Sequence, residues 1–549
     1  AKFPARAVSA NDSYVEGDGR IQLSAAHGTG YSAFDGLTST SWDSTPTRNT
    51  RVSEEVDFGA WLKIQTPESV SLKKAEIESN PYWAQVGAQI DGPDSAAQFG
   101  RAVACNHDGT RVIVGGFPYN SSQGRVRVYD WNGTTWELIG NQTLTGTAPA
   151  DYFGHKVGIS GDGNIIAVTA RDEHGNSLAD SGTVRVYYRV GATWTLLPDS
   201  GGLTSTVGAG QVFVGTQVSD HLGAGGAKLS YDGKTIAMGE IGFDSGGVTN
   251  IGRVRVFTYS SGAWSQKGVD LLGDVTHNQF GHGLDMSEDG NHLVIGTHDN
   301  PTSTTPFVKI YQWNGTAWAQ KGSKLTHNTG YSQSNDGFGK CVSISNDGTV
   351  VAIGIHEADL DDGALVNNGG IVRVFHYVGS DWVVKSTLTD LDTTADQFGM
   401  TAFLSGDGKR LIVGAPFEGT NQGQITTFEY NGGSWVRREP NGSIGAIGNP
   451  GDDGHLGYGP DSDGHSIAIS RDGSTIVGGE WGYNASAGSD SGRVRVFSMP
   501  SNIKSIWGSN DDTNWTKITT APTREEATSN VAGLAFGYDD RLEFKNLDN

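Results

Sequence analysis

The chain contains little cysteine for its size. Its 549 residues include two cysteines, Cys105 and Cys341, which lie at nearly equivalent places in two different copies of the repeat described below. We therefore expect no disulfide between them. A large all-β domain buries enough core to be stable without such bridges, so the scarcity of cysteine does not identify the compartment.

Positive charge and long apolar runs are also scarce. The 39 Lys and Arg residues stand against 61 Asp and Glu residues, which gives a formal net charge of -22. Nucleic acids are bound by patches of Lys and Arg that displace counterions, so we expect no nucleic-acid partner. The sequence has no run of 18 apolar residues, and its first residues do not resemble a signal peptide. We expect a soluble chain without a membrane span, numbered from a processed or excised start.

Glycine, in contrast, is abundant. The chain has 80 glycines, about twice the usual share of roughly 7 per cent. They are scattered among Val, Ile, Thr and aromatic residues and are not gathered in one linker. This distribution is typical of many short strands joined by tight turns.

A repeated unit accounts for these strands. Its best copy runs from Phe153-Gly154 through Ser160-Gly-Asp162-Gly163 and the apolar segment 165–168 to Val184-Arg-Val-Tyr187 and Trp194. Asp-Gly between apolar runs predicts a hairpin, because glycine accepts the positive φ of the turn. The turn aspartate recurs seven times, as Asp108, Asp162, Asp232, Asp289, Asp347, Asp407 and Asp472.

Each copy supplies four strands, and seven such copies predict an all-β, seven-bladed β-propeller. The tryptophan of the fourth strand is missing after Val494-Arg-Val-Phe497 in the last copy. A matching segment, Tyr82-Trp83-Ala-Gln-Val-Gly87, precedes the first copy. We therefore expect strand 82–87 to complete the last blade and close the ring, which removes its open edges.

The motifs resemble the FG-GAP family of propeller repeats. The similarity is carried by Asp151-Tyr-Phe-Gly154, Asp396-Gln-Phe-Gly399 and the other copies, and covers about residues 81–499. Relatives among the integrins hold calcium in Asp-x-Asp-x-Asp-Gly loops, and no run of this chain matches that pattern. The resemblance therefore implies the fold and does not imply calcium in these blades.

The flanking segments 1–80 and 500–549 together resemble a discoidin (coagulation factor 5/8 type C) domain, a β-sandwich of the jelly-roll type. Tyr31 to Ser44, Ala60 to Ile64 and Val70 to Ile77 are similar to its first half, and Ile503 to Thr516 to its continuation. The resemblance implies that the propeller is inserted into this sandwich. An inserted domain must return its two ends close together, which ring closure provides. The family's last strand would follow 542–546, so we expect a natural continuation past Asn549.

Residues repeated in every blade are expected to be scaffold, and function is expected where blades differ. The arginines of the third strand are therefore interpreted as packing and ion-pair residues. They are Arg127, Arg185, Arg255, Arg373 and Arg495, with Lys309 in register.

Possible metal ligands lie outside the repeated positions. Carboxylates cluster in the loops 171–180, 357–362 and 451–463, and Asp359, Asp361 and Asp362 could bind a hard cation such as Ca²⁺. Ordinary solvated loops are the alternative. In the discoidin-like part, Phe34-Asp35-Gly36 and Thr40 match positions that hold a structural calcium in carbohydrate-binding relatives. The resemblance thus implies Ca²⁺ near Asp35 and Thr40.

No catalytic motif is found. The sequence has neither a Gly-x-Ser-x-Gly elbow nor a His-Glu-x-x-His helix, and its 14 histidines show no recurring metal spacing. A carboxylate pair for glycoside cleavage would be recognised only in three dimensions. Eight Asn-x-Ser/Thr sequences are candidates for glycosylation, at Asn11, Asn120, Asn132, Asn141, Asn314, Asn441, Asn484 and Asn514.

Discoidin relatives bind glycans or lipid headgroups, and FG-GAP propellers mediate protein contacts outside the cell. The two resemblances therefore imply a non-enzymatic adhesion protein, extracellular or on a virion surface, that recognises glycans or surface proteins. Two alternatives stay open. One is a structural subunit of a viral particle or extracellular filament, whose loops contact only neighbouring subunits. The other is an extracellular glycosidase.

Overall fold

The computed structural model describes residues in the central part of the chain and in the segments that flank it. It describes the central part of the chain as residues 83–197, 212–298, 306–326, 336–361, 365–366, 368–390, 395–438, 443–445, 455–457 and 466–499, and the flanking segments as seven short strands. The chain divides into two compact units, Trp83–Ser498 and the combination of Ala1–Tyr82 with Met499–Asn549.

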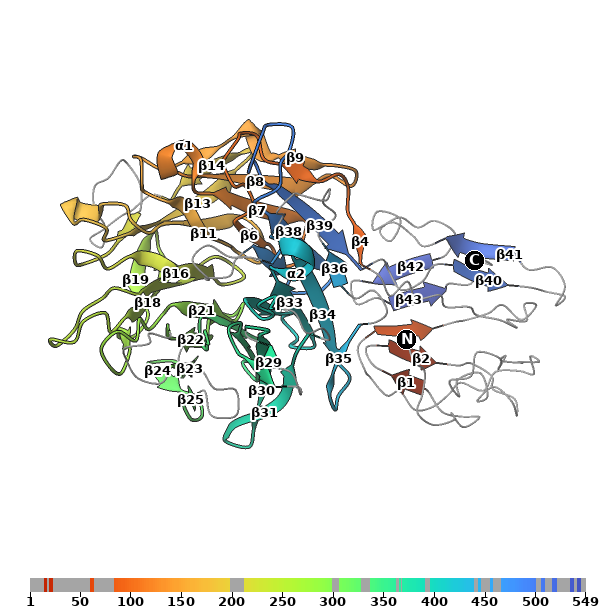
Figure 1. The fold of residues 1–549 in the computed structure, drawn as a ribbon. Helices are drawn as coiled ribbons and strands as arrows, with labels where there is room; N and C mark the ends of the chain where they lie inside the picture. Colours follow the sequence, from red (N-terminus) through yellow and green to blue (C-terminus); the bar gives the residue numbers. More distant parts are fainter. Residues whose placement is uncertain are drawn as a thin grey trace. The chain divides into compact units, whose positions relative to one another are not determined.

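The first unit is a seven-bladed β-propeller, which confirms that prediction. Its seven sheets follow one another around a ring, coloured from orange through yellow and green to blue in Figure 1. The first three blades are β6 (Ala102–Cys105), β7 (Arg111–Gly116), β8 (Arg125–Trp131), β9 (Trp136–Leu138) and β10 (Leu144–Thr145); β11 (Phe153–Ile159), β12 (Ile165–Ala170), β13 (Thr183–Val190), β14 (Thr193–Leu196) and β15 (Val212–Val214); β16 (Leu222–Leu229), β17 (Thr235–Glu240), β18 (Arg253–Ser260), β19 (Ala263–Gln266) and β20 (Leu271–Leu272).

Blades four to six repeat this plan, and blade five uses one long outer strand in place of two short ones. Their strands are β21 (Gly283–Met286), β22 (His292–Gly296), β23 (Phe307–Trp313), β24 (Trp318–Gln320) and β25 (Leu325–Thr326); β26 (Cys341–Ile344), β27 (Val350–Ile355), β30 (Ile371–Val378) and β31 (Asp381–Leu388); β32 (Thr401–Leu404), β33 (Arg410–Ala415), β34 (Gln424–Tyr430), β35 (Trp435–Arg437) and β36 (Ser443–Gly445). A small hairpin, β28 (Leu360–Asp361) with β29 (Leu365–Val366), extends from blade five.

The seventh blade joins both ends of the propeller sequence. Its inner strands are β37 (Ile467–Ile469), β38 (Thr475–Glu480) and β39 (Arg493–Ser498), and its outer strands are β4 (Ala84–Gln85) and β5 (Ile90–Asp91). Phe497 faces Gln85 and Val494 faces Ile90 in antiparallel register. Strand 82–87 was predicted from the sequence to occupy this position and to close the ring.

Among the residues that the structure describes, helical structure is limited to single turns. These are α1 (Tyr119–Ser122), α2 (Glu418–Asn421) and the 3₁₀ turns η2 (Ile139–Asn141) and η3 (Gly175–Ser177). In the described ranges, no helix has the length and apolar character needed to cross a membrane.

The Phe-Gly motif, which is Leu222-Gly223 in blade three and Leu456-Gly457 in blade seven, contacts the preceding blade wherever both sides of this contact are described. Phe153 is fully buried and packs among residues of blade one, and its backbone N–H donates to Gln123 O at 3.2 Å. At the ring closure, Phe99 N–H donates in the same way to Ser491 O at 3.1 Å. A Cβ on Gly124, which lies beside Phe153, would be 2.0 Å from Phe153 O. The repeated glycine before the third strand is therefore required because two backbones meet there.

The flanking segments share a sheet. β1 (Tyr14–Glu16), β2 (Gly19–Gln22), β3 (Ala60–Lys63), β43 (Arg541–Phe544) and β42 (Leu534–Gly537) form one five-stranded sheet in that order. β3 and β43 run parallel, with Leu62 opposite Leu542. β40 (Ser505–Gly508) pairs separately with β41 (Thr516–Thr520). Strands from the two ends of the chain thus belong to one unit.

The closing strand should stabilise the ring as much as an internal outer strand does. Ile90 in β5 and Leu144 in β10 are equivalent, buried, and opposite Val494 and Val126. We expect Ile90→Ala and Leu144→Ala each to lower the free energy of unfolding by about 2 to 5 kcal/mol. Urea denaturation of the full chain would measure both values. A loss for Ile90→Ala far below that for Leu144→Ala would mean that the closing strand contributes little.

Candidate functional site

The first strand of each blade lies nearest the axis and ends at a Ser-x-Asp-Gly turn, in which Asn106 replaces the serine in blade one. In the turn of blade two, Ser160 Oγ donates to Asp162 at 2.5 Å and accepts the Ile165 N–H at 3.0 Å. Asp162 also accepts the Asn164 N–H at 2.9 Å. The same serine–aspartate contact recurs at Ser230, Ser287, Ser345, Ser405 and Ser470. Serine and aspartate are thus repeated because they hold the turn together.

The residue between serine and aspartate joins each turn to the next one around the axis. Every adjacent pair of turns shares a hydrogen bond from a main-chain N–H. These bonds are His107 to Gly161 O (3.0 Å), Asp162 to Tyr231 O (3.0 Å), Tyr231 to Glu288 O (2.7 Å), Glu288 to Asn346 Oδ1 (3.2 Å), Asn346 to Gly406 O (2.7 Å), Gly406 to Arg471 O (2.7 Å) and Asp472 to His107 O (3.1 Å). A continuous belt of hydrogen bonds therefore encircles this end of the axis.

Two positions of this belt are glycines for a steric reason. A Cβ on Gly161 would lie 2.2 Å from the Tyr231 ring, and one on Gly406 would lie 2.5 Å from Asn346 Nδ2. The neighbouring side chains occupy that space. The residue between serine and aspartate is therefore glycine in a turn where a side chain of the neighbouring turn fills the space.

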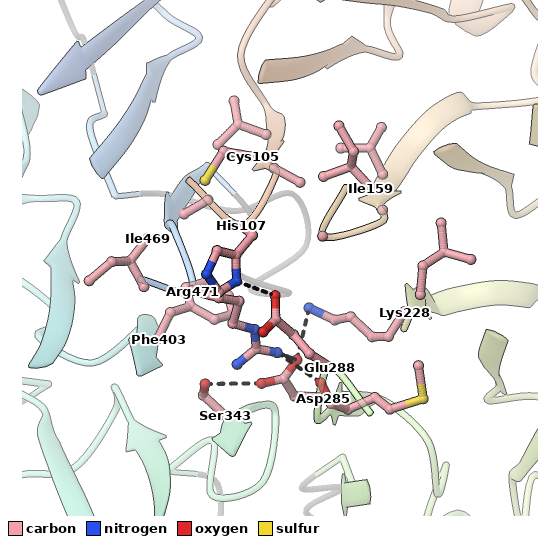
Figure 2. Close-up of a pocket in the computed structure, with 18 of the residues that line it drawn as sticks. Cys105, His107, Ile159, Lys228, Asp285, Glu288, Ser343, Phe403, Ile469 and Arg471 are labelled. Atoms are coloured by element: carbon pink, nitrogen blue, oxygen red, sulfur yellow. Dashed lines mark hydrogen bonds and ion pairs between the residues drawn. The ribbon is translucent and has the colours of Figure 1, made fainter. Parts of the chain in front are cut away.

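A cavity of about 110 Å³ lies beside the belt, lined by residues of all seven first strands and several turns. In each blade, the residue two positions before the turn serine faces the cavity. In blade one, Asn106 stands in place of that serine. The seven cavity-facing residues are Ala104, Gly158, Lys228, Asp285, Ser343, Phe403 and Ala468. Figure 2 shows charged groups converging from different blades. Charge is thus concentrated on one part of the wall, while the rest is small or apolar.

Asp285 is the centre of the charged part. Its side chain is 4 % exposed, and its Oδ2 accepts the Ser343 hydroxyl and the Ile344 N–H, both at 3.0 Å. Its Oδ1 lies 3.3 Å from Arg471 Nη2 and 3.6 Å from Lys228 Nζ. Burial alone would raise the pKa of Asp285, but the charges of Arg471 and Lys228 lower it below its usual value. Asp285 is therefore an ionised group that is neutralised inside the cavity.

A second pair of charged side chains, His107 and Glu288, also lines the cavity. His107 Nδ1 lies 2.8 Å from Glu288 Oε1, and Asn346 Nδ2 donates to Glu288 Oε2 at 2.8 Å. The hydrogen bond with Glu288 raises the pKa of His107 in spite of partial burial. His107 also contacts the Tyr231 ring edge to face, with centroids 5.5 Å apart.

The ionisable groups of this cavity are engaged with one another or protonated. Asp285 and Glu288 are both engaged by basic side chains. Burial raises the pKa of the Cys105 thiol in the wall, which keeps it in the less reactive protonated form. The volume is well below the roughly 300 to 1,000 Å³ of ordinary ligand pockets. The arrangement can stabilise the ring and hold water, but it has little room for a substrate.

The His107–Glu288 pair should make stability depend on pH. Because the folded pKa of His107 is raised, its contribution is fully present below the unfolded value of about 6.5 and is lost as pH rises through the folded value. We expect His107→Gln to lower the melting temperature more at pH 5.5 than at pH 8.5, by an amount equivalent to under about 1 kcal/mol. Thermal melts across this range would measure it, with His174→Gln, an exposed histidine, as control. A pH-independent difference would contradict the assignment.

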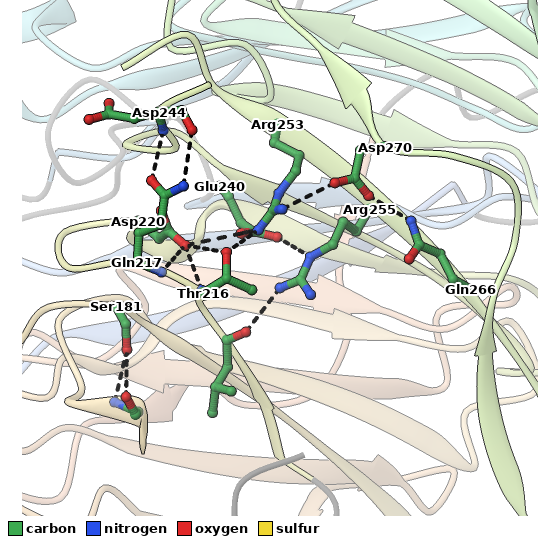
Figure 3. Close-up of polar contacts among 12 residues, drawn as sticks. Ser181, Thr216, Gln217, Asp220, Glu240, Asp244, Arg253, Arg255, Gln266 and Asp270 are labelled. Atoms are coloured by element: carbon green, nitrogen blue, oxygen red, sulfur yellow. Dashed lines mark hydrogen bonds and ion pairs between the residues drawn. The ribbon is translucent and has the colours of Figure 1, made fainter. Parts of the chain in front are cut away.

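Three of the third-strand arginines, Arg185, Arg255 and Arg495, form ion pairs with buried glutamates, as the repeats predicted, whereas Arg127 Nε donates to Thr143 Oγ1 at 2.9 Å. Arg255 and Arg253 both contact Glu240, which is fully buried, and Arg253 reaches Asp270 at 3.1 Å (Figure 3). Arg255 Nη2 also donates to Val214 O of the preceding blade at 3.0 Å. Related pairs are Arg185 with Glu173, Arg493 and Arg495 with Glu480, and Lys309 with Asp274. These cations are therefore scaffold.

Removing the shared carboxylate should be costly. Glu240→Ala would leave two buried guanidinium groups without their main counter-ion, and we expect a loss of about 3 to 5 kcal/mol in the free energy of unfolding. Glu137→Ala removes an exposed glutamate and should change the same quantity by less than about 0.5 kcal/mol. Chemical denaturation of both variants compares them. Equal losses in the two variants would show that the ion pairs of Glu240 contribute no more to the free energy of unfolding than an exposed glutamate does.

The predicted metal ligands are only partly described by the structure. Asp35, Thr40 and Asp362 lie outside the described residues, and for Asp361 only the backbone of β28 is described. Asp359 Oδ1 accepts the Asn368 N–H at 3.0 Å, which spans the base of the β28–β29 hairpin. Where side chains are described, no group of three His, Cys, Asp or Glu residues could hold a metal ion.

Five of the candidate glycosylation asparagines are described, and all are exposed: Asn120, Asn132, Asn141, Asn314 and Asn484. Asn11, Asn441 and Asn514 lie outside the described residues. The side-chain oxygen of Asn132 accepts the Thr134 and Thr135 N–H groups at 2.8 and 2.7 Å, and Asn314 makes the equivalent contacts. Asparagine recurs at these two sites because it holds the hairpin between the third and fourth strands.

The charged residues that line the cavity were not among the predicted site residues. Lys228 and Asp285 occupy a repeat position that in the other five blades carries Ala, Gly, Ser or Phe. Aligning the seven copies column by column would have revealed two charges on an inward-facing position. The pairing of Asp285 with Arg471 could not have been found in this way, because it crosses the ring.

No protein-family model and no curated protein matches the chain. Solved structures with similar backbones include hydrazine synthase from Kuenenia stuttgartiensis, with 13% identity, a TM-score of 0.42, and coverage of 72% of this chain and 94% of that one. Another is a protein described as a "putative 6-phosphogluconolactonase" from Bacteroides uniformis, with 12% identity, a TM-score of 0.41, and coverage of 75% and 97%. These similarities are too low to carry a function.

Proposed function

We propose that the chain is a non-enzymatic binding protein that recognises glycans or surface proteins outside the cell or on a virion. The observation that carries this proposal is the axial cavity. It is small, and its carboxylates Asp285 and Glu288 are already paired with basic groups. A glycosidase would need two carboxylates on either side of a cleft that admits a sugar.

The proposal also includes the families of the two domains. We propose that the blades are of the FG-GAP type and that the propeller is inserted into a discoidin-like sandwich. The buried phenylalanine and the close backbone contact at each Phe-Gly motif support the first assignment. The parallel pairing of β3 with β43 supports a flanking domain that is split by the propeller.

Calcium is proposed in the discoidin-like unit, near Asp35 and Thr40. Its support is the sequence resemblance, and the acidic loop at Asp359, Asp361 and Asp362 is the second candidate. A bound cation would use carbonyl as well as carboxylate oxygens. The exposure of five candidate asparagines is compatible with a glycosylated, extracellular surface.

A glycan array probed with the full chain, with and without EDTA, tests the proposal. We expect specific binding that EDTA weakens. The triple variant Asp359→Ala, Asp361→Ala, Asp362→Ala removes the acceptor of the Asn368 N–H, and we expect this to lower the free energy of unfolding by about 0.5 to 1.5 kcal/mol while the propeller stays folded. It should bind less if that loop contacts the ligand or its cation.

Three results would contradict parts of this proposal. Binding that is unchanged in EDTA, together with no metal by elemental analysis, would remove the calcium site. Self-assembly without ligand binding would favour a structural subunit. Turnover of a polysaccharide that is abolished by one Asp or Glu substitution would make the protein an enzyme.

A further inference from the structure

Blade five ends in an outer strand that differs from those of the other blades. β31 is continuous over 8 residues, whereas β9, β24 and β35, which carry the equivalent tryptophan in blades one, four and six, have 3 residues each. β31 pairs with β30 on one side, and no strand that the structure describes pairs with its other side. Blade five therefore presents the longest outer strand among the described blades (Figure 1).

Exposed apolar side chains lie on this strand. Val383 and Val384 follow the buried Trp382 and are 45 % and 47 % exposed. At the position of Val383, blade six carries Val436 on its short strand, and the remaining blades carry Glu, Thr, Ser or Ala. A single exposed valine is ordinary, but two adjacent valines on a long, unpaired edge form a surface on which another strand can pair.

The backbone of β31 also has groups that point away from β30. The Trp382 N–H donates to the side chain of Asp381 at 2.9 Å. Residues of an antiparallel strand face the neighbouring strand with their N–H and C=O groups at every second position. Val384 lies two positions after Trp382, in unbroken register with β30. The main-chain groups of Trp382 and Val384 therefore lie on the outer edge.

Charged residues flank the valines in a self-complementary order. Asp381 lies two residues before Val383, and Lys385 lies two residues after it. When two copies of β31 are aligned antiparallel with Val383 opposite Val383, Asp381 of each copy is opposite Lys385 of the other. The same alignment places Trp382 opposite Val384, so that the outward main-chain groups of both copies meet. The order of charges thus favours a second copy of this chain over an unrelated strand.

Both charges are available for such a contact. Asp381 accepts the Ser323 N–H at 2.7 Å and the Ser323 hydroxyl at 2.9 Å, and these neutral donors hold the carboxylate in place without cancelling its charge. Lys385 is exposed, and it has no ion-pair partner among the described residues. Lys385 also has no partner on β30, because Val384 and Ser386 pair with the consecutive residues Phe375 and Val374. This β-bulge limits regular pairing to the first half of the strand.

We propose that β31 is the contact surface for a second copy of this chain, with the two strands paired antiparallel about a two-fold axis at Val383. The valine side chains would pack at the axis, and the two Asp381–Lys385 pairs would fix the register. A two-fold contact uses each edge once, so it yields a dimer and not a fibre. The pairing is short, and we expect a weak, reversible dimer. This inference is independent of the proposed glycan-binding function.

Sedimentation equilibrium of the full chain measures the association. We expect a monomer–dimer equilibrium at concentrations up to about 0.5 mM. Val383→Lys places like charges opposite each other at the axis and should weaken dimerisation about tenfold or more. The matched control is Val436→Lys, at the equivalent position of blade six, which should change the dissociation constant less than about twofold. Thermal melts confirm that each variant is folded.

A charge exchange tests the register. Lys385→Glu alone places Glu opposite Asp381, and Asp381→Lys alone places Lys opposite Lys385, so each variant should dimerise less than the native chain. In an equimolar mixture, every charged position of one variant is opposite an unlike charge of the other. We therefore expect the mixture to regain the dimer, a result that damage to either fold would not produce.

Cross-linking gives a direct measure of proximity. Directly opposite residues at a non-hydrogen-bonded position have Cα atoms about 4.5 Å apart, which is within the range of a disulfide. Val383→Cys should therefore give a reducible covalent dimer on mild oxidation, and Val436→Cys should give far less.

Three results would overturn the assignment. A chain that stays monomeric up to about 0.5 mM, without a Val383→Cys cross-link, has no such contact. A dimer that Val383→Lys weakens no more than Val436→Lys does is formed by another surface. Single charge variants that dimerise as the native chain does, or a mixture that does not regain the dimer, would exclude this register. None of these results bears on glycan binding, which the array measures separately.

Discussion

The backbone contact between each Phe-Gly motif and the glycine of the preceding blade is the constraint on which the propeller depends. Phe153 N–H reaches Gln123 O, and the adjacent Gly124 approaches Phe153 so closely that no Cβ fits. The phenylalanine ring then fills the core between two blades. Because the contact from Phe99 to Ser491 has the same geometry, the first and last blades meet as any other pair does.

The two ends of the ring are held together by different contacts. At the Ser-x-Asp-Gly end, main-chain hydrogen bonds join successive turns into a belt, and ion pairs around Asp285 and Glu288 fill the axis. These charges satisfy one another. At the Phe-Gly end, the second strands release side chains such as Trp481 and Arg171 at the surface. The Phe-Gly end is held instead by the backbone contacts of the motif and by the buried ion pairs of Glu240 and Glu480.

Repetition separates scaffold from specific residues only when exposure is also known. Arg255 and Arg101 are both arginines, but Arg255 recurs in register and clamps the buried Glu240, whereas Arg101 occupies a position that changes between blades. The structure shows that recurrence at Ser160 and Asp162 follows from turn hydrogen bonds. The candidate asparagines at Asn132 and Asn314 have a comparable local role in hairpin turns.

The seven-bladed propeller was predictable from the sequence, because Asp-Gly turns, alternating strands and the Phe-Gly motif are local patterns that repeat. The cavity and the contacts between the first and last blades were not. Arg471 and Asp285 are 186 residues apart in the chain, and Trp481 meets Arg101 across the closing seam. Local sequence determines where a strand or turn forms and which way its side chains alternate. Which variable side chains become neighbours is decided only when the ring closes and blades distant in sequence meet.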